Sequence, residues 1–256
     1  MNNRRDFFRK SMMAGISLMV LPEIAQTVVR EQNGVAAPKI RLNKESVILF
    51  QGDSITDCGR NKESNICNTF EQLGSGYALF AATQLLKGHA DKQLKIYNRG
   101  ISGNKVYQLR ERWEMEALAF QPDVLSLLIG VNDYWHTLDG GYKGTLDIYE
   151  TDLRALLEYT KKKQPSVQMV ICEPFVLKGG AAIDDSKWFP MFDDYRKVVR
   201  QIAHDFDAVF VPFQSAFDAA VKLAPTRYWA ADGVHPDLPG RQLMADVWLE
   251  ATGLNK

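Results

Sequence analysis

Short apolar runs alternate with longer amphipathic stretches along most of this chain. The runs are rich in branched aliphatic residues and bounded by polar or turn-forming positions, which is typical of buried strands. They cover residues 47–51, 94–98, 124–129, 167–172 and 208–211. Because most of the runs are apolar throughout rather than alternating, the pattern predicts strands that are covered on both faces.

The stretches between the runs repeat apolar residues at the spacing of a helix. They cover residues 69–86, 105–119, 146–163, 191–206, 213–223 and 238–252. Helical crossovers between successive strands place those strands parallel. The pattern therefore predicts an α/β fold, a three-layer α/β/α sandwich around a five-stranded parallel sheet. We expect one domain, since no repeat, low-complexity linker or break in composition divides it.

The first residues do not follow this pattern. Arg4 and Arg5 precede a short apolar stretch at residues 12–21, and the small residues Val35-Ala36-Ala37 come later. A basic start before a short apolar stretch is typical of an export signal, and paired arginines indicate the twin-arginine route. The apolar stretch is shorter than the roughly 20 residues that span a bilayer.

The N-terminal pattern predicts a leader and linker at residues 1–37 and a folded domain at residues 38–256. We expect a protein exported to the periplasm or outside the cell, with no stable membrane anchor. The alternative is an N-terminal anchor or a disordered tail.

The charge balance limits the class of partner. The chain has 256 residues, with 31 Lys and Arg against 31 Asp and Glu, so its formal net charge is zero. Nucleic acids require a basic surface, and we therefore expect no nucleic-acid partner. The oligomeric state is left open by the sequence.

Histidine and cysteine positions predict no metal or cofactor site. The four histidines are scattered without a pair at ligand spacing, and no phosphate loop or dinucleotide fingerprint is present. Cys58 and Cys67 either form a disulfide or stay as free thiols. Cys172 falls in an apolar run, where a small core residue is expected.

Polar and glycine residues follow the first three predicted strands. These segments are Gly52-Asp53-Ser54, residues 98–103 and residues 130–133. The carboxyl ends of parallel strands meet at one edge of a sheet, which is where ligands bind in such folds. Ser54 is therefore placed to attack a ligand at this edge.

A base and its orienting acid occur near the end of the chain. His235 is three residues after Asp232, and a histidine that takes the serine proton needs such a carboxylate beside it. The amides of Ser54 and Gly100 and the side chain of Asn132 supply donors for the oxyanion that forms on the attacked carbonyl. The sequence thus predicts a serine hydrolase with the triad Ser54, His235 and Asp232.

These residues, in this order, resemble the four sequence blocks of the SGNH/GDSL hydrolase family. The blocks correspond to Gly52-Asp53-Ser54, Asn98-Arg99-Gly100, residues 129–133 and residues 232–236. The resemblance covers nearly all of the chain after residue 45. It implies the flavodoxin-like fold of that family and the same catalytic roles for the residues named above. The family's leucine after the serine is replaced here by Ile55.

The predicted triad and oxyanion donors indicate ester hydrolysis through an acyl-enzyme. The substrate is less sharply defined by the sequence. Aromatic residues beside the third and fourth blocks provide faces on which sugar rings stack, although aromatic residues also serve as core packing. The candidates for substrate contact are Asp53, Tyr134, Trp135 and Trp229.

The family resemblance implies removal of O-acetyl groups from carbohydrates, with a small-molecule or oligosaccharide ester as substrate. The same family includes lipolytic esterases, aryl esterases and thioesterases, which are the alternative. A glycan-binding protein with a decayed catalytic site is the alternative of a different class.

Overall fold

The computed structural model describes residues 21–34 and 39–255. Five parallel strands form one sheet in the order β2-β1-β3-β4-β5. The strands are β1 (Val47–Gly52), β2 (Lys95–Asn98), β3 (Val124–Leu128), β4 (Gln168–Cys172) and β5 (Val209–Val211). All five predicted strands are confirmed, each within one residue of its expected ends.

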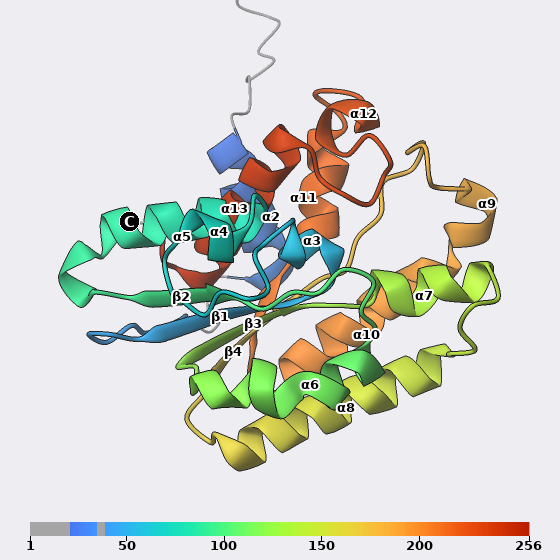
Figure 1. Ribbon diagram of the computed structural model, residues 1–256. Helices are drawn as coiled ribbons and strands as arrows, with labels where there is room; N and C mark the ends of the chain where they lie inside the picture. Colours follow the sequence, from blue (N-terminus) through green and yellow to red (C-terminus); the bar gives the residue numbers. More distant parts are fainter. Residues whose placement is uncertain (1–20, 35–38, 256) are drawn as a thin grey trace, which may run out of the picture.

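Helices cover both faces of the sheet, as Figure 1 shows. One layer contains α5 (Tyr77–Gly88), α11 (Phe213–Ala220) and α13 (Leu238–Thr252). The other contains α6 (Val106–Glu116), α8 (Leu146–Lys163) and α10 (Met191–Asp205). The predicted three-layer sandwich is therefore confirmed.

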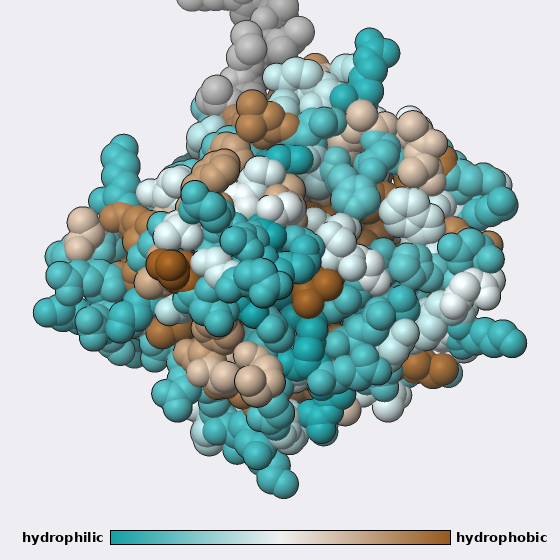
Figure 2. Space-filling view, viewed as in Figure 1, coloured by the Kyte–Doolittle hydropathy of each residue, from teal (hydrophilic) through white to brown (hydrophobic). Residues whose placement is uncertain are grey.

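The sheet residues form the centre of the core. All the residues of β3 are buried, and so is all of β1 except the partly exposed Val47. On the face shown in Figure 2, hydrophobic residues occur as scattered spots among hydrophilic ones. No helix among the described residues is long and apolar enough to cross a membrane.

One predicted helix is broken into two. Residues 69–86 form α4 (Phe70–Leu73) and α5, separated by Gly74-Ser75-Gly76. A Cβ atom at Gly74 would lie 2.6 Å from the Asp57 carbonyl oxygen, and one at Gly76 would lie 2.7 Å from Cys58 Cβ. The break lets the backbone approach the loop after the nucleophile, which is a tertiary contact that helical periodicity does not report.

Four shorter helices lie at the carboxyl end of the sheet or in the connections that lead back to it. They are α3 (Ser54–Asp57), α7 (Val131–Leu138), α9 (Asp185–Trp188) and α12 (Thr226–Trp229). They were not expected, because each is too short for a clear hydrophobic period. α3 and α7 matter most, since each begins within one residue of a predicted catalytic group.

An N-terminal helix differs from the expected boundary at residue 37. Residues 21–33, predicted as part of the leader, form α2 (Leu21–Asn33), which packs against α11 and α13. Its buried face consists of Ile24, Ala25, Val28 and Val29. This face has helical spacing and is covered by α11 and α13, so the packed part of the chain includes residues before the expected boundary, while the leader itself stays a prediction. Arg4, Arg5 and residues 35–37 lie outside the described residues, and export stays a prediction.

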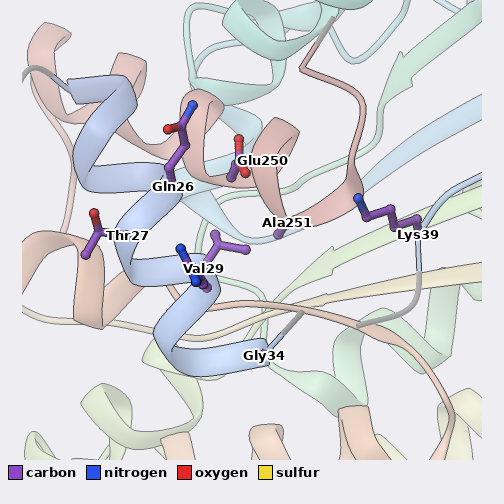
Figure 3. Close-up of a pocket in the computed structure, with 8 residues that line it drawn as sticks. Gln26, Thr27, Val29, Gly34, Lys39, Glu250 and Ala251 are labelled. Carbon is purple, nitrogen blue, oxygen red and sulfur yellow. The ribbon is translucent and has the colours of Figure 1, made fainter. Parts of the chain in front are cut away.

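The packing of α2 leaves a cavity of about 500 Å³ beside the end of α13 (Figure 3). Gln26 and Val29 of α2 line it together with Lys39, Glu250 and Ala251. None of the predicted catalytic residues belongs to this cavity.

Candidate active site

Ser54 is the first residue of α3, directly after β1. The helix begins there because the Asp53 side chain accepts a hydrogen bond from the Ile55 amide at 3.0 Å, as an N-terminal cap does. The serine is thus presented at the carboxyl edge of the sheet and at the positive end of a helix.

A continuous chain of hydrogen bonds joins the three predicted catalytic side chains. Ser54 Oγ lies 2.8 Å from His235 Nε2, and His235 Nδ1 lies 2.6 Å from Asp232 Oδ2. Oδ1 of Asp232 accepts from the amides of Val234 and His235 at 2.8 and 2.7 Å. These amide bonds fix the carboxylate, which in turn fixes the imidazole with its Nε2 toward the serine.

The electrostatics of the pair favour an ionised acid beside a basic imidazole. Burial acts to raise the pKa of Asp232, but hydrogen bonds from His235 and Val234 outweigh it and lower the pKa to about 2. The hydrogen bond to Asp232 raises the pKa of His235 above its ordinary value of 6.5, against the opposing effect of burial. The histidine is therefore a stronger base than a free imidazole.

Two of the three predicted oxyanion donors have an N–H available. Among the described residues, no hydrogen bond is recorded from the Ser54 amide. Asn132 lies at the start of α7, and its Nδ2 donates one hydrogen bond to the Asn104 carbonyl at 3.2 Å. An amide nitrogen carries two hydrogens, so the second one remains for an oxyanion.

The third predicted donor is already engaged. The Gly100 amide donates to Asn98 Oδ1 at 2.9 Å, and it serves an oxyanion only where this bond opens or is shared. A glycine is required at this position, because a Cβ atom would lie 2.5 Å from the Asp57 nitrogen. The role of Gly100 as an oxyanion donor stays a prediction.

Residues missed by the sequence analysis hold these loops in place. The guanidinium of Arg112 donates to Asn104 Oδ1 at 2.8 Å, to the Arg99 carbonyl at 2.9 Å and to the Gly52 carbonyl at 3.3 Å. It therefore ties together the loops after β1 and β2. Arg112 lies in the middle of α6 and gives no local signal of this role.

The candidates for substrate contact are not all accessible. Asp53, Tyr134 and Trp229 are buried, and the Tyr134 hydroxyl donates to the Lys187 carbonyl. Little of these three side chains is accessible in the structure, and their contact with a substrate stays a prediction. Trp135 is partly exposed, and its ring centroid lies 6.4 Å from that of His235. It is the one aromatic candidate placed beside the catalytic base.

Two buried carboxyl groups stand behind the site. Asp53 and Asp133 are 1% and 2% exposed, and Oδ2 of each has no hydrogen-bond partner among the described residues. Burial raises the pKa of both from 3.8 to about 7, and the charge of Asp53 contributes to the shift of Asp133. Both groups lie beneath the site, and contact of Asp53 with a substrate stays a prediction.

The cysteines and the candidate metal ligands can be compared with the prediction. Cys58, Cys67 and Cys172 are free thiols, and Cys172 is buried, as expected of a core residue. Within residues 21–34 and 39–255, no group of three or more His, Cys, Asp or Glu side chains is arranged to hold a metal ion.

The α/β/α fold and this triad together define a serine hydrolase. The chain belongs to the GDSL-like lipase/acylhydrolase family, whose model matches residues 50–243. It is accordingly a carboxylic ester hydrolase, similar to an acetylxylan esterase.

The chain is similar to a named esterase over most of its length. An acetylxylan esterase from Geobacillus stearothermophilus is 34% identical over 219 residues, which cover 84% of this chain and 97% of the relative. Its crystal structure matches with a TM-score of 0.75, at 34% identity and with the same coverage. Structures described as catalytic mutants of that enzyme replace one serine, one aspartate and one histidine.

A second solved structure is more similar in sequence. It comes from Parabacteroides merdae, is described as a GDSL-like lipase, and is 73% identical to this chain. The match covers 85% of this chain and 100% of the other, with a TM-score of 0.84. Both comparisons agree with the α/β fold.

Proposed function

We propose that this esterase removes O-acetyl groups from carbohydrates through an acyl-enzyme on Ser54. The observation that carries the proposal is the unbroken hydrogen-bond chain from Ser54 through His235 to Asp232. The similarity to an acetylxylan esterase over nearly that enzyme's whole length supports the acetyl-carbohydrate substrate.

The first half-reaction transfers the acetyl group to the enzyme. His235 Nε2 takes the proton of Ser54 as its oxygen attacks the ester carbonyl. The oxyanion that develops is stabilised by the Ser54 amide and by the second Nδ2 hydrogen of Asn132. The protonated His235 then gives its proton to the departing sugar oxygen, and the acetyl group stays on Ser54.

The second half-reaction releases acetate. His235, neutral again, takes a proton from water as the water oxygen attacks the acetyl-serine carbonyl. The tetrahedral intermediate collapses, the Ser54 oxygen leaves, and His235 returns the proton to it. The ionised Asp232 stabilises the imidazolium in both halves, because it accepts the Nδ1 hydrogen throughout.

The open surroundings of the triad are compatible with a substrate longer than one sugar. Side chains of His235 and Asp232 are 44% and 35% exposed. Trp135 offers an aromatic face beside them. The proposed substrate is therefore an acetylated oligosaccharide that lies across the surface at the triad.

The test is an acetate-release assay with acetylated xylo-oligosaccharides, compared with lysophospholipid, an aryl ester of a long acyl chain and a thioester. Release of acetate in large excess over the other products is expected. Faster cleavage of the lipid, aryl or thioester substrate would replace the proposal with the alternative in the same family. Failure of a fluorophosphonate probe to label Ser54 in folded protein would favour a binding protein without catalysis.

We also propose export by the twin-arginine route, on the basis of Arg4, Arg5 and the short apolar stretch after them. Fractionation of cells that express the full chain, with and without Arg4→Lys and Arg5→Lys, tests it. Equal amounts of enzyme outside the cytoplasm in both cases would contradict this route.

A further inference from the structure

Lys105 is a buried ammonium group that makes no ion pair within the described part of the chain. It is 6% exposed, and among the described residues its Nζ makes one recorded hydrogen bond, to His136 Nδ1 at 3.0 Å. Its Nζ also lies 5.6 Å from the ring centroid of Tyr107 and 5.4 Å from that of Tyr142. A buried charge normally has an opposite charge in contact, so this arrangement lacks a partner.

Backbone and side-chain bonds hold Lys105 against the oxyanion loop. On one side, the Asn104 carbonyl accepts from Asn132 Nδ2 at 3.2 Å. On the other, the Val106 amide donates to Asp133 Oδ1 at 3.0 Å. Lys105 lies between these two attachments and is thus fixed beside the residue that stabilises the oxyanion.

His136 lies one helical turn after Asn132 on α7, and it does not balance the charge of Lys105. Burial and the positive charge of Lys105 both lower the pKa of His136, so the imidazole is neutral. Its Nδ1 accepts from the ammonium, which places its hydrogen on Nε2. The nearby Asp133 compensates weakly, because burial raises its pKa to about 7.

Two tyrosine rings complete the cluster. Tyr107 and Tyr142 are stacked, with centroids 5.7 Å apart and an angle of 22° between the rings. Tyr107 is 37% exposed, and Tyr142 is partly exposed. Their faces hold the ammonium by cation–π interactions and leave aromatic surface to a ligand.

We propose that Lys105, His136, Tyr107 and Tyr142 form a subsite for a carboxylate-bearing sugar, so that the preferred substrate is an acetylated glycan with a uronic acid unit near the acetyl group. The ammonium pairs with the carboxylate, His136 Nε2 donates to the sugar, and the tyrosines pack against the ring. This subsite rests on the proposed deacetylase function and determines which glycan that function serves.

The test compares two acetylated xylo-oligosaccharides that differ in one uronic acid side group. Wild-type enzyme is expected to have a kcat/KM at least tenfold higher on the acidic substrate, mainly through a lower KM. Lys105→Met, which keeps the length of the side chain but removes its charge, is expected to bring the acidic-to-neutral ratio close to one. Lys143→Met, a change of an exposed lysine in the loop that carries Tyr142, is the matched control and should keep the ratio.

A second measurement needs no substitution at Lys105. The preference of the wild-type enzyme should weaken as salt rises from roughly 0.05 to 0.5 M, because ions screen the pairing of ammonium and carboxylate. An acidic-to-neutral ratio near one in the wild type, or a ratio that Lys105→Met leaves unchanged, overturns the subsite.

Binding separates this inference from the proposed function. Ser54→Ala should bind the deacetylated acidic oligosaccharide at least tenfold more tightly than the neutral one in calorimetry. Binding with this preference but no acetate release from any glycan would contradict the deacetylase function alone. Acetate release without this preference would contradict the subsite alone.

Discussion

At the scale of single residues, reactivity depends on short contacts that the backbone fixes. The serine hydroxyl is an ordinary alcohol until His235 takes its proton, and His235 is held by a carboxylate that two amides orient. Each of the three triad residues lies at the end of a secondary-structure element or in a loop. Substitution there changes chemistry with little effect on the core.

Replacement of the nucleophile should separate catalysis from folding. Ser54→Ala is expected to abolish acetate release, while the thermal unfolding temperature stays within a few degrees of the parent, because Ser54 is partly exposed and its truncation opens no cavity. Ser166→Ala, in an exposed turn before β4, is the control and should keep full activity. Turnover by Ser54→Ala at the parental rate would mean that another residue is the nucleophile.

The titration of His235 should define the acidic limb of the pH profile. The base must be neutral, and its pKa is raised above 6.5 by Asp232, so kcat/KM should rise with pH through a value above 6.5. In Asp232→Asn the raising hydrogen bond to a carboxylate is lost, and the limb should move to lower pH at a much lower rate. Measurement of kcat/KM between about pH 4 and 9 checks the limb of the parent and its shift in the variant. If the limb of Asp232→Asn lies at the same pH as that of the parent, Asp232 does not raise the pKa of His235.

Loss of the side-chain oxyanion donor should lower turnover strongly. Asn132→Ala removes the free Nδ2 hydrogen, and a reduction of kcat by about a hundredfold or more is expected. Asn255→Ala, in the exposed segment after α13, is the matched control. If the kcat of Asn132→Ala equals that of the parent, the oxyanion is bound by other donors.

The residues of the triad were predictable, but their neighbours were not. Ser54, Asp232 and His235 carry their signal in local motifs, and the structure brings them within hydrogen-bond distance. Arg112 acts through three carbonyl or amide oxygens on distant loops, which no local pattern records. Burial of Trp229 likewise depends on the whole fold and cannot be read from its position beside a motif.

At the scale of elements, hydrophobic patterning predicted every strand and the long helices of both layers. It failed where tertiary contacts decide the backbone, as at Gly74 and Gly76, which break a predicted helix to admit the Cys58 loop. It did not single out α2, whose buried amphipathic face lies within the segment predicted as leader and linker. Short segments such as α7 carry too little periodicity to be recognised.

The packing of α2 should contribute to the free energy of unfolding. Ile24 is 1% exposed, and Ile24→Ala should lower the free energy of unfolding by about 2 kcal/mol or more in the full chain. Gln26→Ala, on the exposed side of the same helix, should change it by no more than about 0.5 kcal/mol. Equal denaturation midpoints for the two variants would show that α2 does not pack on the domain in solution.

At the scale of the whole molecule, the two buried carboxyls should make stability depend on pH. The folded state raises the pKa of Asp53 and Asp133 from 3.8 to about 7, so between these pH values it binds more protons than the unfolded chain. Stability from these groups is therefore present at low pH and is lost as pH rises through about 7. This pH dependence of stability therefore comes from Asp53 and Asp133, at the edge of the sheet that carries the active site.

Asp133→Asn should remove part of that dependence. An asparagine keeps the carbonyl oxygen that accepts from the Val106 amide but cannot ionise. The variant should melt near the parent at pH 5 and several degrees above it at pH 8, as thermal unfolding at a series of pH values will show. A difference in melting temperature that stays constant with pH would contradict the raised pKa of Asp133.

The position of the triad along the chain has a consequence for the time at which activity arises. Ser54 and His235 are separated by 181 residues, and the last strand of the sheet ends at Val211. A growing polypeptide therefore contains all five strand segments and its nucleophile before the base has been synthesised. Until the final tenth of the chain is made, the nascent protein lacks His235, which takes the proton of Ser54.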